Sequence, residues 1–166
     1  NFVFKNDDWK EWKLCDGSPV LVPGGFNTDP EPNGDLLLYP NADKTAPPSG
    51  KMPKGGWYFD LLVRQPPIDE DNLDVDDNLE EFTAISDAEL DHFRCEVERL
   101  YHETDKAVLA NFGGTSIGNI ARVPAPNLRY PKGIRDTEEW YISHTTRRDY
   151  LYELFDRQCE IALANL

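Results

Sequence analysis

One loop of this sequence combines glycines with an aromatic ring and a hydroxyl group: Phe112, Gly113, Gly114 and Thr115. It follows the apolar run 107–110, which predicts a short strand. Glycines after a strand leave backbone N–H groups free to face a ligand, and a helix that starts there favours negative charge. The spacing differs from the G-x-G-x-x-G dinucleotide fingerprint. Two interpretations stay open, a ligand-binding loop and a tight strand-to-helix turn.

The stretch 50–56 (GKMPKGG) is a second place where glycines and lysines could contact a phosphate group. A phosphate loop requires a lysine where Gly56 stands, and Pro53 has no N–H to donate. Such a loop is also followed by a helix, whereas a strand-like run follows here. The stretch therefore predicts a turn whose glycines accept positive φ angles.

The run 57–63 after this turn predicts a strand rich in aromatic residues. Side chains alternate along a strand, so Trp57 and Phe59 would share one face and Tyr58 and Asp60 the other. Tyr58 and Asp60 could then line a polar pocket. The other interpretation is a core face, with Trp57 and Phe59 packed inward and a tyrosine at the boundary.

The residues that most often bind metals or act as nucleophiles form no recognisable site. The cysteines are three in number and far apart, which excludes a disulfide framework and a CxxC pair and favours a reducing cytoplasm. No two histidines have metal-ligand spacing, and no G-x-S-x-G motif is present. These residues are Cys15, Cys95, Cys159, His92, His102 and His144.

The chain is strongly acidic. Asp and Glu outnumber Lys and Arg by 31 to 17 among its 166 residues, and the net charge is −14. Such a surface repels phosphate backbones and anionic lipid headgroups, so we expect neither nucleic acid nor a membrane as a partner. The length suits one domain with a hydrophobic core. Asn1 in place of a start methionine, and a helical pattern that continues to Leu166, predict a fragment of a longer protein.

The pattern along the chain predicts three parts. Residues 1–65 read as short strands and turns, with hairpin signals at Asp16-Gly17 and Asn33-Gly34. Residues 66–85 are acidic with little periodicity and predict a surface linker. Residues 86–166 read as helix, short strand and helix. The predicted fold class is α+β, an antiparallel β-hairpin region followed by a partial α/β unit.

Three helices are expected in the third part. The first runs over 86–103, starts with a Ser86/Glu89 capping box and has a stripe of apolar residues that should be buried. Asp136 is expected to cap a helix over 137–142, and a last helix should begin at Arg147. The first stripe comprises Leu90, Phe93, Val97, Leu100 and Tyr101, and that of the last helix Leu151, Leu154, Phe155, Cys159, Ala162 and Leu163.

Three stretches resemble the uroporphyrinogen decarboxylase superfamily, in particular uroporphyrinogen decarboxylase-like proteins that are similar to corrinoid-dependent methyltransferases. They are VPGGFNTDPEPNGDLLLYP (22–40), APPSGKMPKGGWYFD (46–60) and VLANFGGTSIGNIARV (108–123). The resemblance covers the whole chain, as the N-terminal to middle part of a member. It implies a parent with a (β/α)₈ barrel, to which 86–166 would contribute a helix, the barrel strand 106–111 and the next helix.

The resemblance also implies a function for the parent, either tetrapyrrole decarboxylation or corrinoid-dependent methyl transfer. Phe112, Gly113, Gly114 and Thr115 would face the substrate at the barrel mouth. The decarboxylase's arginine-rich loop and the methyltransferase's His-x-Cys zinc ligands are not found here, so no catalytic residue or metal site is assigned. Zinc or a corrinoid would belong to the parent, and the segment alone is expected to be inactive.

The alternative is a non-catalytic binding or interaction module that uses its surface aromatics for a sugar or a peptide. Tyr58 and Asp60 remain candidate ligand contacts in either case. Part of a barrel would expose apolar edges, so self-association into a homo-oligomer is also expected.

Overall fold

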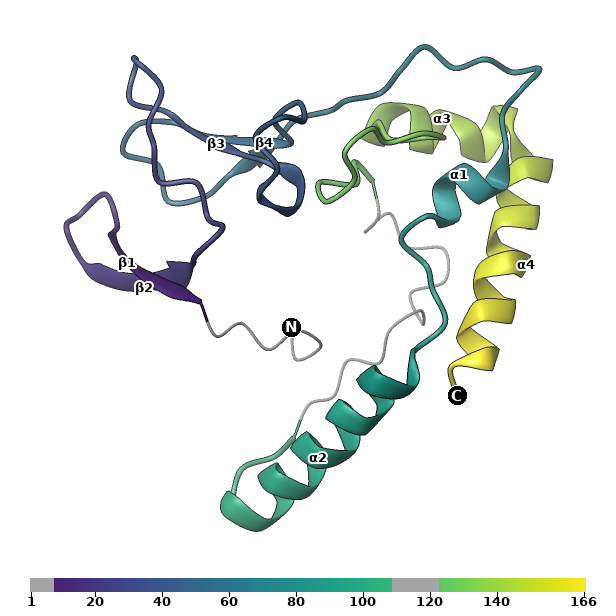
Figure 1. Cartoon of the computed structure of the whole chain (residues 1–166). Coiled ribbons are helices and arrows are strands. Elements are labelled where there is room, and N and C mark those ends of the chain that lie inside the picture. Colours follow the sequence, from purple (N-terminus) through teal and green to yellow (C-terminus); the bar gives the residue numbers. More distant parts are fainter. Residues whose placement is uncertain (1–7, 109–122) are drawn as a thin grey trace.

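The computed structural model describes residues 8–108 and 123–166, and these residues form two small antiparallel sheets followed by helices (Figure 1). The predicted α+β class is therefore confirmed. The two sheets in the described part contain antiparallel pairs only. Of the barrel strand expected over 106–111, the described residues 106–108 do not have strand geometry.

The first sheet is a hairpin of β1 (Trp9–Lys13) and β2 (Pro19–Pro23), with Trp12 opposite Val20. The turn between the strands has Gly17 at φ +85°, a conformation that glycine adopts without strain. The Asp16 carboxylate accepts hydrogen bonds from the backbone and the hydroxyl of Ser18. The hairpin predicted from Asp16-Gly17 is thus confirmed.

The second sheet is a three-stranded meander of β3 (Leu36–Leu38), β4 (Gly50–Met52) and β5 (Asp60–Leu61), with the short 3₁₀ helix η1 (Pro40–Ala42) after β3. The strand expected over 57–63 is shorter than predicted. Trp57 precedes β5 in a bend and is 53% exposed, so the prediction that it packs inward is wrong. Because Trp57 is not paired with β4, the alternation of a strand does not determine its direction.

The acidic segment 66–85 was predicted as a surface linker, yet it contributes part of the core. Its helix α1 (Val75–Leu79) is capped by Asp74, whose side chain accepts a hydrogen bond from the backbone of Asp76. Val75, Leu79 and Phe82 are buried, while the capping carboxylates face solvent. A single helical turn with apolar residues four apart is enough to bury one side of an acidic segment.

Helices α3 (Thr137–Thr146) and α4 (Arg148–Ala164) complete this core. Asp136 caps α3 through the backbone of Glu138, as predicted. The buried side of α4 differs at its end from the predicted stripe, because Gln158 is buried and Leu163 is 66% exposed. The core residues are Val75, Leu79, Phe82, Ile134, Trp140, Leu151 and Leu154.

Helix α2 (Asp87–Glu103) begins with the predicted capping box, in which Ser86 and Glu89 bond each other's backbone N–H groups. The prediction that its apolar stripe is buried is wrong, because no residue of α2 is buried. Figure 1 shows α2 extending away from α1, α3 and α4.

The loop 123–136 joins the β region to the helices. Arg64 donates to the carbonyl of Ala125, and Arg129 donates to the hydroxyl of Thr45. Gln65 accepts from the backbone of Arg135 and donates to the carbonyl of Gly133. Arg64 and Gln65 lie between β5 and α1, whereas Thr45 lies in the turn between η1 and β4. None of the described helices is long and apolar enough to cross a membrane.

Candidate functional site

The glycine loop expected to contact a ligand, Phe112, Gly113, Gly114 and Thr115, lies outside the described residues. Its role stays a prediction. Tyr58 and Asp60 are described, and both are exposed, Tyr58 to 84%. Asp60 lies in β5 opposite Lys51, and Tyr58 lies in the bend before it. Neither side chain lines one of the three cavities described below.

A groove of about 190 Å³ lies between the hairpin β1–β2 and the sheet β3–β4–β5. We call it the β groove. Leu36 and Met52, each only 7% exposed, line it from neighbouring strands, where they are paired in register. Trp12 lines the groove from the hairpin. The ring of Phe26 lies 5.2 Å from the Trp12 ring, which supports the indole from behind.

An aromatic row connects the two sheets behind the β groove. Phe26 contacts Trp12 and also lies 5.9 Å from Phe59 in an edge-to-face arrangement. Phe59 is the residue directly before β5, so the row extends from the hairpin to the far strand of the second sheet. The half-buried Phe59 thus has the inward role predicted for it.

Asp35 fixes the turns at one end of the β groove. Its carboxylate accepts hydrogen bonds from the backbone of Lys54 (3.0 Å) and the side-chain amide of Asn33 (2.9 Å), and it pairs with Lys51 (2.6 Å). The hydrogen bond and charge of Lys51, together with the Lys54 N–H, lower the pKa of Asp35 below its ordinary 3.8. The carboxylate is therefore ionised at neutral pH and ties the turn 53–56 to the turn 33–34.

Gly34 brings the side chain of Lys54 close to this turn. Gly34 has φ +90°, and a β-carbon there would lie 2.8 Å from Cδ of Lys54. Only glycine combines this φ with this close approach without strain. The stem of Lys54 consequently packs against Gly34, and both residues line the β groove.

Two lysines, Lys13 and Lys54, are among the residues that line the β groove. Within the described ranges, neither of them forms an ion pair with a carboxylate. By contrast, Lys44 and Lys51 pair with Asp29 and Asp35 at 2.6 Å. The β groove therefore has an apolar floor and one tryptophan, and two of the lysines that line it have no carboxylate partner within the described ranges.

A second cavity of about 440 Å³ lies on the opposite face of the same sheet. Leu37 and Lys51 line it, and these residues alternate along β3 and β4 with the residues of the β groove. Its charged groups are Glu31, Asp35 and Lys51, and Lys51 is already paired with Asp35. This cavity offers no cation for an anionic ligand.

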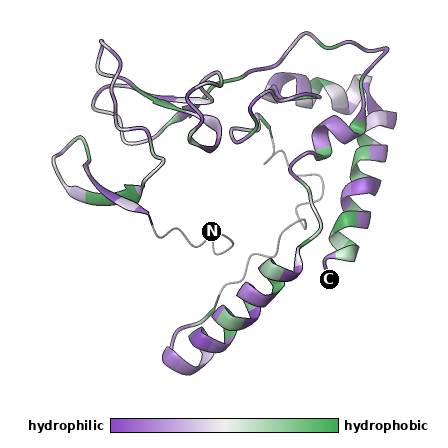
Figure 2. Cartoon of the chain, viewed as in Figure 1, coloured by the Kyte–Doolittle hydropathy of each residue, from purple (hydrophilic) through white to green (hydrophobic). Residues whose placement is uncertain are grey.

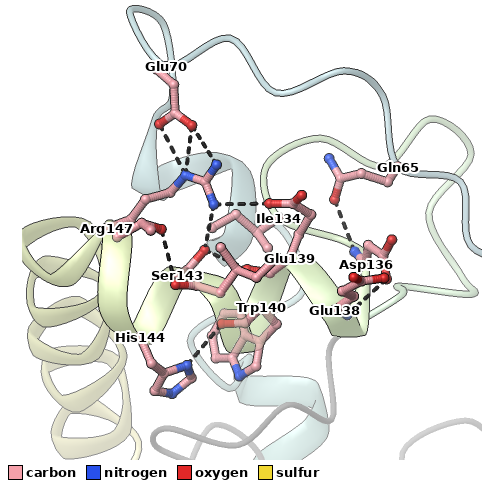
Figure 3. A network of polar contacts seen from close by, with 12 residues as sticks. Gln65, Glu70, Ile134, Asp136, Glu138, Glu139, Trp140, Ser143, His144 and Arg147 are labelled. Carbon is pink, nitrogen blue, oxygen red and sulfur yellow. Dashed lines mark hydrogen bonds and ion pairs between the residues drawn. The ribbon is translucent and has the colours of Figure 1, made fainter.

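A third cavity of about 600 Å³ surrounds Arg147, which lies between α3 and α4. Figure 3 shows its guanidinium between Glu70 on one side and Glu139 and Ser143 on the other. The Arg147 hydrogen bond lowers the pKa of Glu70, and the two carboxylates raise the pKa of Arg147. Because the guanidinium is satisfied by its own chain, we interpret this network as a structural clamp.

Sequence reasoning missed three residues of the β groove: Trp12, Lys13 and Lys54. Only the hairpin itself was predicted, and nothing in the spacing indicates that Trp12 and Met52 line one groove, since they come from different sheets. The one sequence feature that pointed to this groove was the pair of lysines within 51–54, and it was interpreted as part of a turn.

Among the residues that the structure describes, no group of three or more His, Cys, Asp or Glu side chains could hold a metal ion. The chain was also compared with known proteins. No protein-family model, no curated protein and no solved structure matches it.

Proposed function

We propose that this chain is a binding module whose β groove holds a single-ring acidic sugar, such as a uronic acid residue. The observation that carries this proposal is that one groove is lined by a supported tryptophan and by two lysines that have no carboxylate partner in the described part of the chain. An aromatic face packs against the C–H groups of a sugar ring, and lysines pair with its carboxylate. This proposal develops the alternative of a binding module that uses aromatic residues.

The size of the β groove limits the ligand. Sites for drug-sized ligands enclose about 300–1,000 Å³, whereas this groove has about 190 Å³. One six-membered ring with its substituents suits such a volume, and a larger chain of sugars would extend along the surface beyond it. Trp57 is 53% exposed and directly follows the groove residue Gly56, which supports it as the contact for a second ring.

The lysines of the groove favour an anionic ligand, although the molecule as a whole carries a negative net charge. A net charge of −14 repels anionic ligands at long range, but this repulsion is screened beyond about 8 Å at physiological ionic strength. Lys13 and Lys54 have no carboxylate partner in the described part of the chain, so they are available to pair with the carboxylate of a ligand. We therefore expect affinity for the acidic sugar to exceed that for the neutral one.

Titration of the ¹⁵N-labelled protein with D-glucuronate tests this function, with the Trp12 indole N–H as the reporter. D-glucose supplies the ring without the charge, and acetate supplies the charge without the ring, each at the same ionic strength. We expect glucuronate to shift the Trp12 resonance with millimolar affinity, and both controls to bind more weakly. The resonance that disappears in the Trp12→Phe variant is thereby assigned to the Trp12 indole.

Two pairs of variants complete the titration. Trp12→Leu should weaken glucuronate binding about tenfold, or about 1.4 kcal/mol, and the matched Trp57→Leu should weaken it less. Lys13→Gln with Lys54→Gln should weaken it about twofold to thirtyfold, at about 0.2–1 kcal/mol for each of the two exposed charge pairs. Lys44→Gln with Lys106→Gln changes the net charge equally and should have no effect. Equal losses in the two lysine pairs, or no Trp12 shift at all, would contradict the proposal.

A second candidate function follows from the resemblance of 22–40, 46–60 and 108–123 to the uroporphyrinogen decarboxylase superfamily. In this case the chain is part of a cytoplasmic (β/α)₈ enzyme that acts on a tetrapyrrole or a corrinoid. The predicted substrate contacts are then Phe112, Gly113, Gly114 and Thr115. Zinc or a corrinoid would be held by parts of the parent other than this segment.

Titration with a coproporphyrin and with cobalamin distinguishes the two candidates. A tetrapyrrole is far too large for a groove of about 190 Å³, so its binding should not depend on Lys13 or Lys54. Binding that is lost in Phe112→Ala but kept in Trp12→Leu would support the enzyme fragment. The reverse result with glucuronate would support the binding module.

A further inference from the structure

The turn before β3 contains a chemically reactive pair of residues, Asn33-Gly34. No other asparagine of the sequence is followed by glycine. In such a pair the backbone nitrogen of the glycine can attack Cγ of the asparagine, because glycine has no β-carbon to obstruct the approach. The attacking nitrogen gives up its proton and the side-chain amide nitrogen leaves as ammonia, so that a five-membered succinimide ring forms. Water then opens the ring at either carbonyl, which leaves aspartate or isoaspartate.

The folded turn holds the reacting groups in hydrogen bonds. The Gly34 N–H donates to the carbonyl of Glu31 at 2.8 Å. The side-chain oxygen of Asn33 accepts from the backbone N–H of Asp35 at 3.0 Å, and its side-chain amide donates to the Asp35 carboxylate at 2.9 Å. The attacking nitrogen and both ends of the attacked amide are therefore occupied. Ring closure requires these bonds to open, so the native turn should slow the reaction.

Asp35 maintains this arrangement because other parts of the sheet anchor it. Asp35 is buried, whereas Asn33 is exposed to water. The Asp35 carboxylate pairs with Lys51 of β4 at 2.6 Å and accepts from the backbone N–H of Lys54 at 3.0 Å. The carboxylate is therefore fixed by β4 and by the turn that follows it, and it holds the Asn33 side chain in one place.

The products of the reaction do not fit this turn. Either product has a carboxylate at position 33, in place of the amide that donates to Asp35 at 2.9 Å. Two carboxylates at that separation repel each other, and burial of one of them strengthens the repulsion. Isoaspartate also adds one carbon to the backbone before Gly34, which changes the reach of the turn. Both products should therefore displace the Asp35 carboxylate from the N–H of Lys54.

We propose that Asn33 is a deamidation site that the native fold keeps closed through Asp35, and that its conversion irreversibly releases the backbone of Lys54. Gly34 and Lys54 both line the β groove. Conversion would thus alter the end of the β groove where these two residues lie, whatever ligand the groove holds. The inference depends on the contacts of the turn alone and is independent of the acidic-sugar function.

Peptide mapping by mass spectrometry measures the conversion of Asn33 in the whole chain, at mildly alkaline pH, in native buffer and in guanidinium chloride. We expect conversion in native buffer to be at least about tenfold slower, which corresponds to about 1.4 kcal/mol of protection. Equal rates would show that the turn gives no protection. Absence of conversion in guanidinium chloride would show that Asn33 is not a deamidation site. Either result overturns the proposal.

Asp35→Ala and Asp29→Ala form a matched pair for the same measurement. Each removes a carboxylate that pairs with a lysine, but the Asp29 carboxylate has no bond to Asn33. In native buffer Asp35→Ala should raise the rate of conversion close to that in guanidinium chloride, and Asp29→Ala should keep the wild-type rate. Lys51→Met, with Lys44→Met as its control, removes only the anchor of the carboxylate and should give an intermediate rate. Equal rates within either pair overturn the protective role of Asp35.

The variant Asn33→Asp reproduces one product and tests its consequence. Hydrogen exchange of the Lys54 amide should become at least about tenfold faster, or about 1.4 kcal/mol less protected, because its acceptor Asp35 moves away. Asn72→Asp adds the same charge at an exposed residue that bonds Asp69 instead, and it should leave the Lys54 amide unchanged. An unchanged Lys54 amide in Asn33→Asp, or an equal change in both variants, overturns the proposed release.

Discussion

Helices α2 and α4 differ in burial although they have the same length of 17 residues and a similar mixture of polar and apolar residues (Figure 2). Helix α4 packs against α1 and α3 and buries Leu151, Leu154, Gln158 and Ala162. Helix α2 buries none of its residues. The comparison shows that an amphipathic pattern reveals a face that needs a partner, but not which partner covers it.

The surroundings of the two helices explain the difference. Next to α4, the loop 123–136 is held in place by polar side chains that satisfy its backbone. Asn78 donates to the carbonyl of Ile134 and accepts from its N–H, and Gly133 leaves the space that Asn78 occupies. This pairing places Ile134 and Trp140 beneath α4, so the apolar face of α4 has a fixed surface to pack on.

The largest expected effect is at Arg135, whose side chain is fully buried beneath the helical core. It donates to the carbonyls of Lys132 and Asp77 and pairs with Glu81 at 3.5 Å. Arg135→Met should lower the free energy of unfolding by about 3–5 kcal/mol, because Glu81 and two carbonyls lose a buried donor. Arg94→Met on exposed α2 should change it by less than about 0.5 kcal/mol. Urea denaturation measures both, and similar losses would contradict the comparison.

Truncation of one leucine in each helix tests the comparison directly. Leu154→Ala in α4, where the side chain is 1% exposed, should cost about 2–5 kcal/mol through a new cavity. Leu100→Ala in α2 should leave the stability of the dilute monomer within about 0.5 kcal/mol of wild type. An equal cost at Leu100 would show that α2 packs on its own chain.

Tyr150 supplies a pH-dependent test of the α4 side. Its hydroxyl donates to Asn78 at 2.7 Å, and burial, the largest cause, raises its pKa above the ordinary value of 10.0. The native state holds the proton more tightly than the unfolded state, so this stability is complete below pH 10 and is lost as the pH rises through the folded pKa. Tyr150→Phe should cost about 1 kcal/mol at neutral pH and reduce the loss above pH 10. Thermal unfolding at pH 7 and pH 10.5 measures both, with Tyr152→Phe as the exposed control.

The smallest effect is expected at the surface clamp of Glu70 and Arg147. The Arg147 hydrogen bond lowers the pKa of Glu70, so the contribution of this pair is present above the ordinary pKa of 4.5 and is lost as the pH falls through the folded value. Glu70→Gln should make unfolding slightly less dependent on pH below about 4.5. Glu98→Gln on α2 serves as a control. Identical pH profiles for Glu70→Gln and wild type would contradict the role of the clamp.

Local signals allowed much of the fold to be predicted. The hairpin at Asp16-Gly17, the Ser86 capping box and the Asp136 cap each depend on residues within a few positions of one another, and each is confirmed. Gly34 lies in a turn, but the hairpin predicted at Asn33-Gly34 is wrong, because β3 pairs with β4 and no strand directly precedes this turn. The role of the acidic segment 66–85 in the core was not predicted, because it depends on contacts with residues about sixty positions later, such as the bonds between Asn78 and Ile134.

The β groove could not be predicted for a similar reason. Trp12 and Met52 belong to different sheets, and the row through Phe26 that brings the sheets together has no periodic signal in the sequence. The expected face shared by Tyr58 and Asp60 depended on a long strand, whereas β5 has only two residues. The predicted glycine loop at 112–115 lies outside the described residues and remains a prediction.

Hydrogen exchange of the two helices, measured at a low and a high protein concentration, tests the central claim most directly. The amides of α4 should be protected equally at both concentrations, because the core of the same chain covers this helix. The amides of α2 should exchange faster than those of α4 at both concentrations, because α2 buries none of its residues. Protection of α2 that equals that of α4 in the dilute sample would contradict the account.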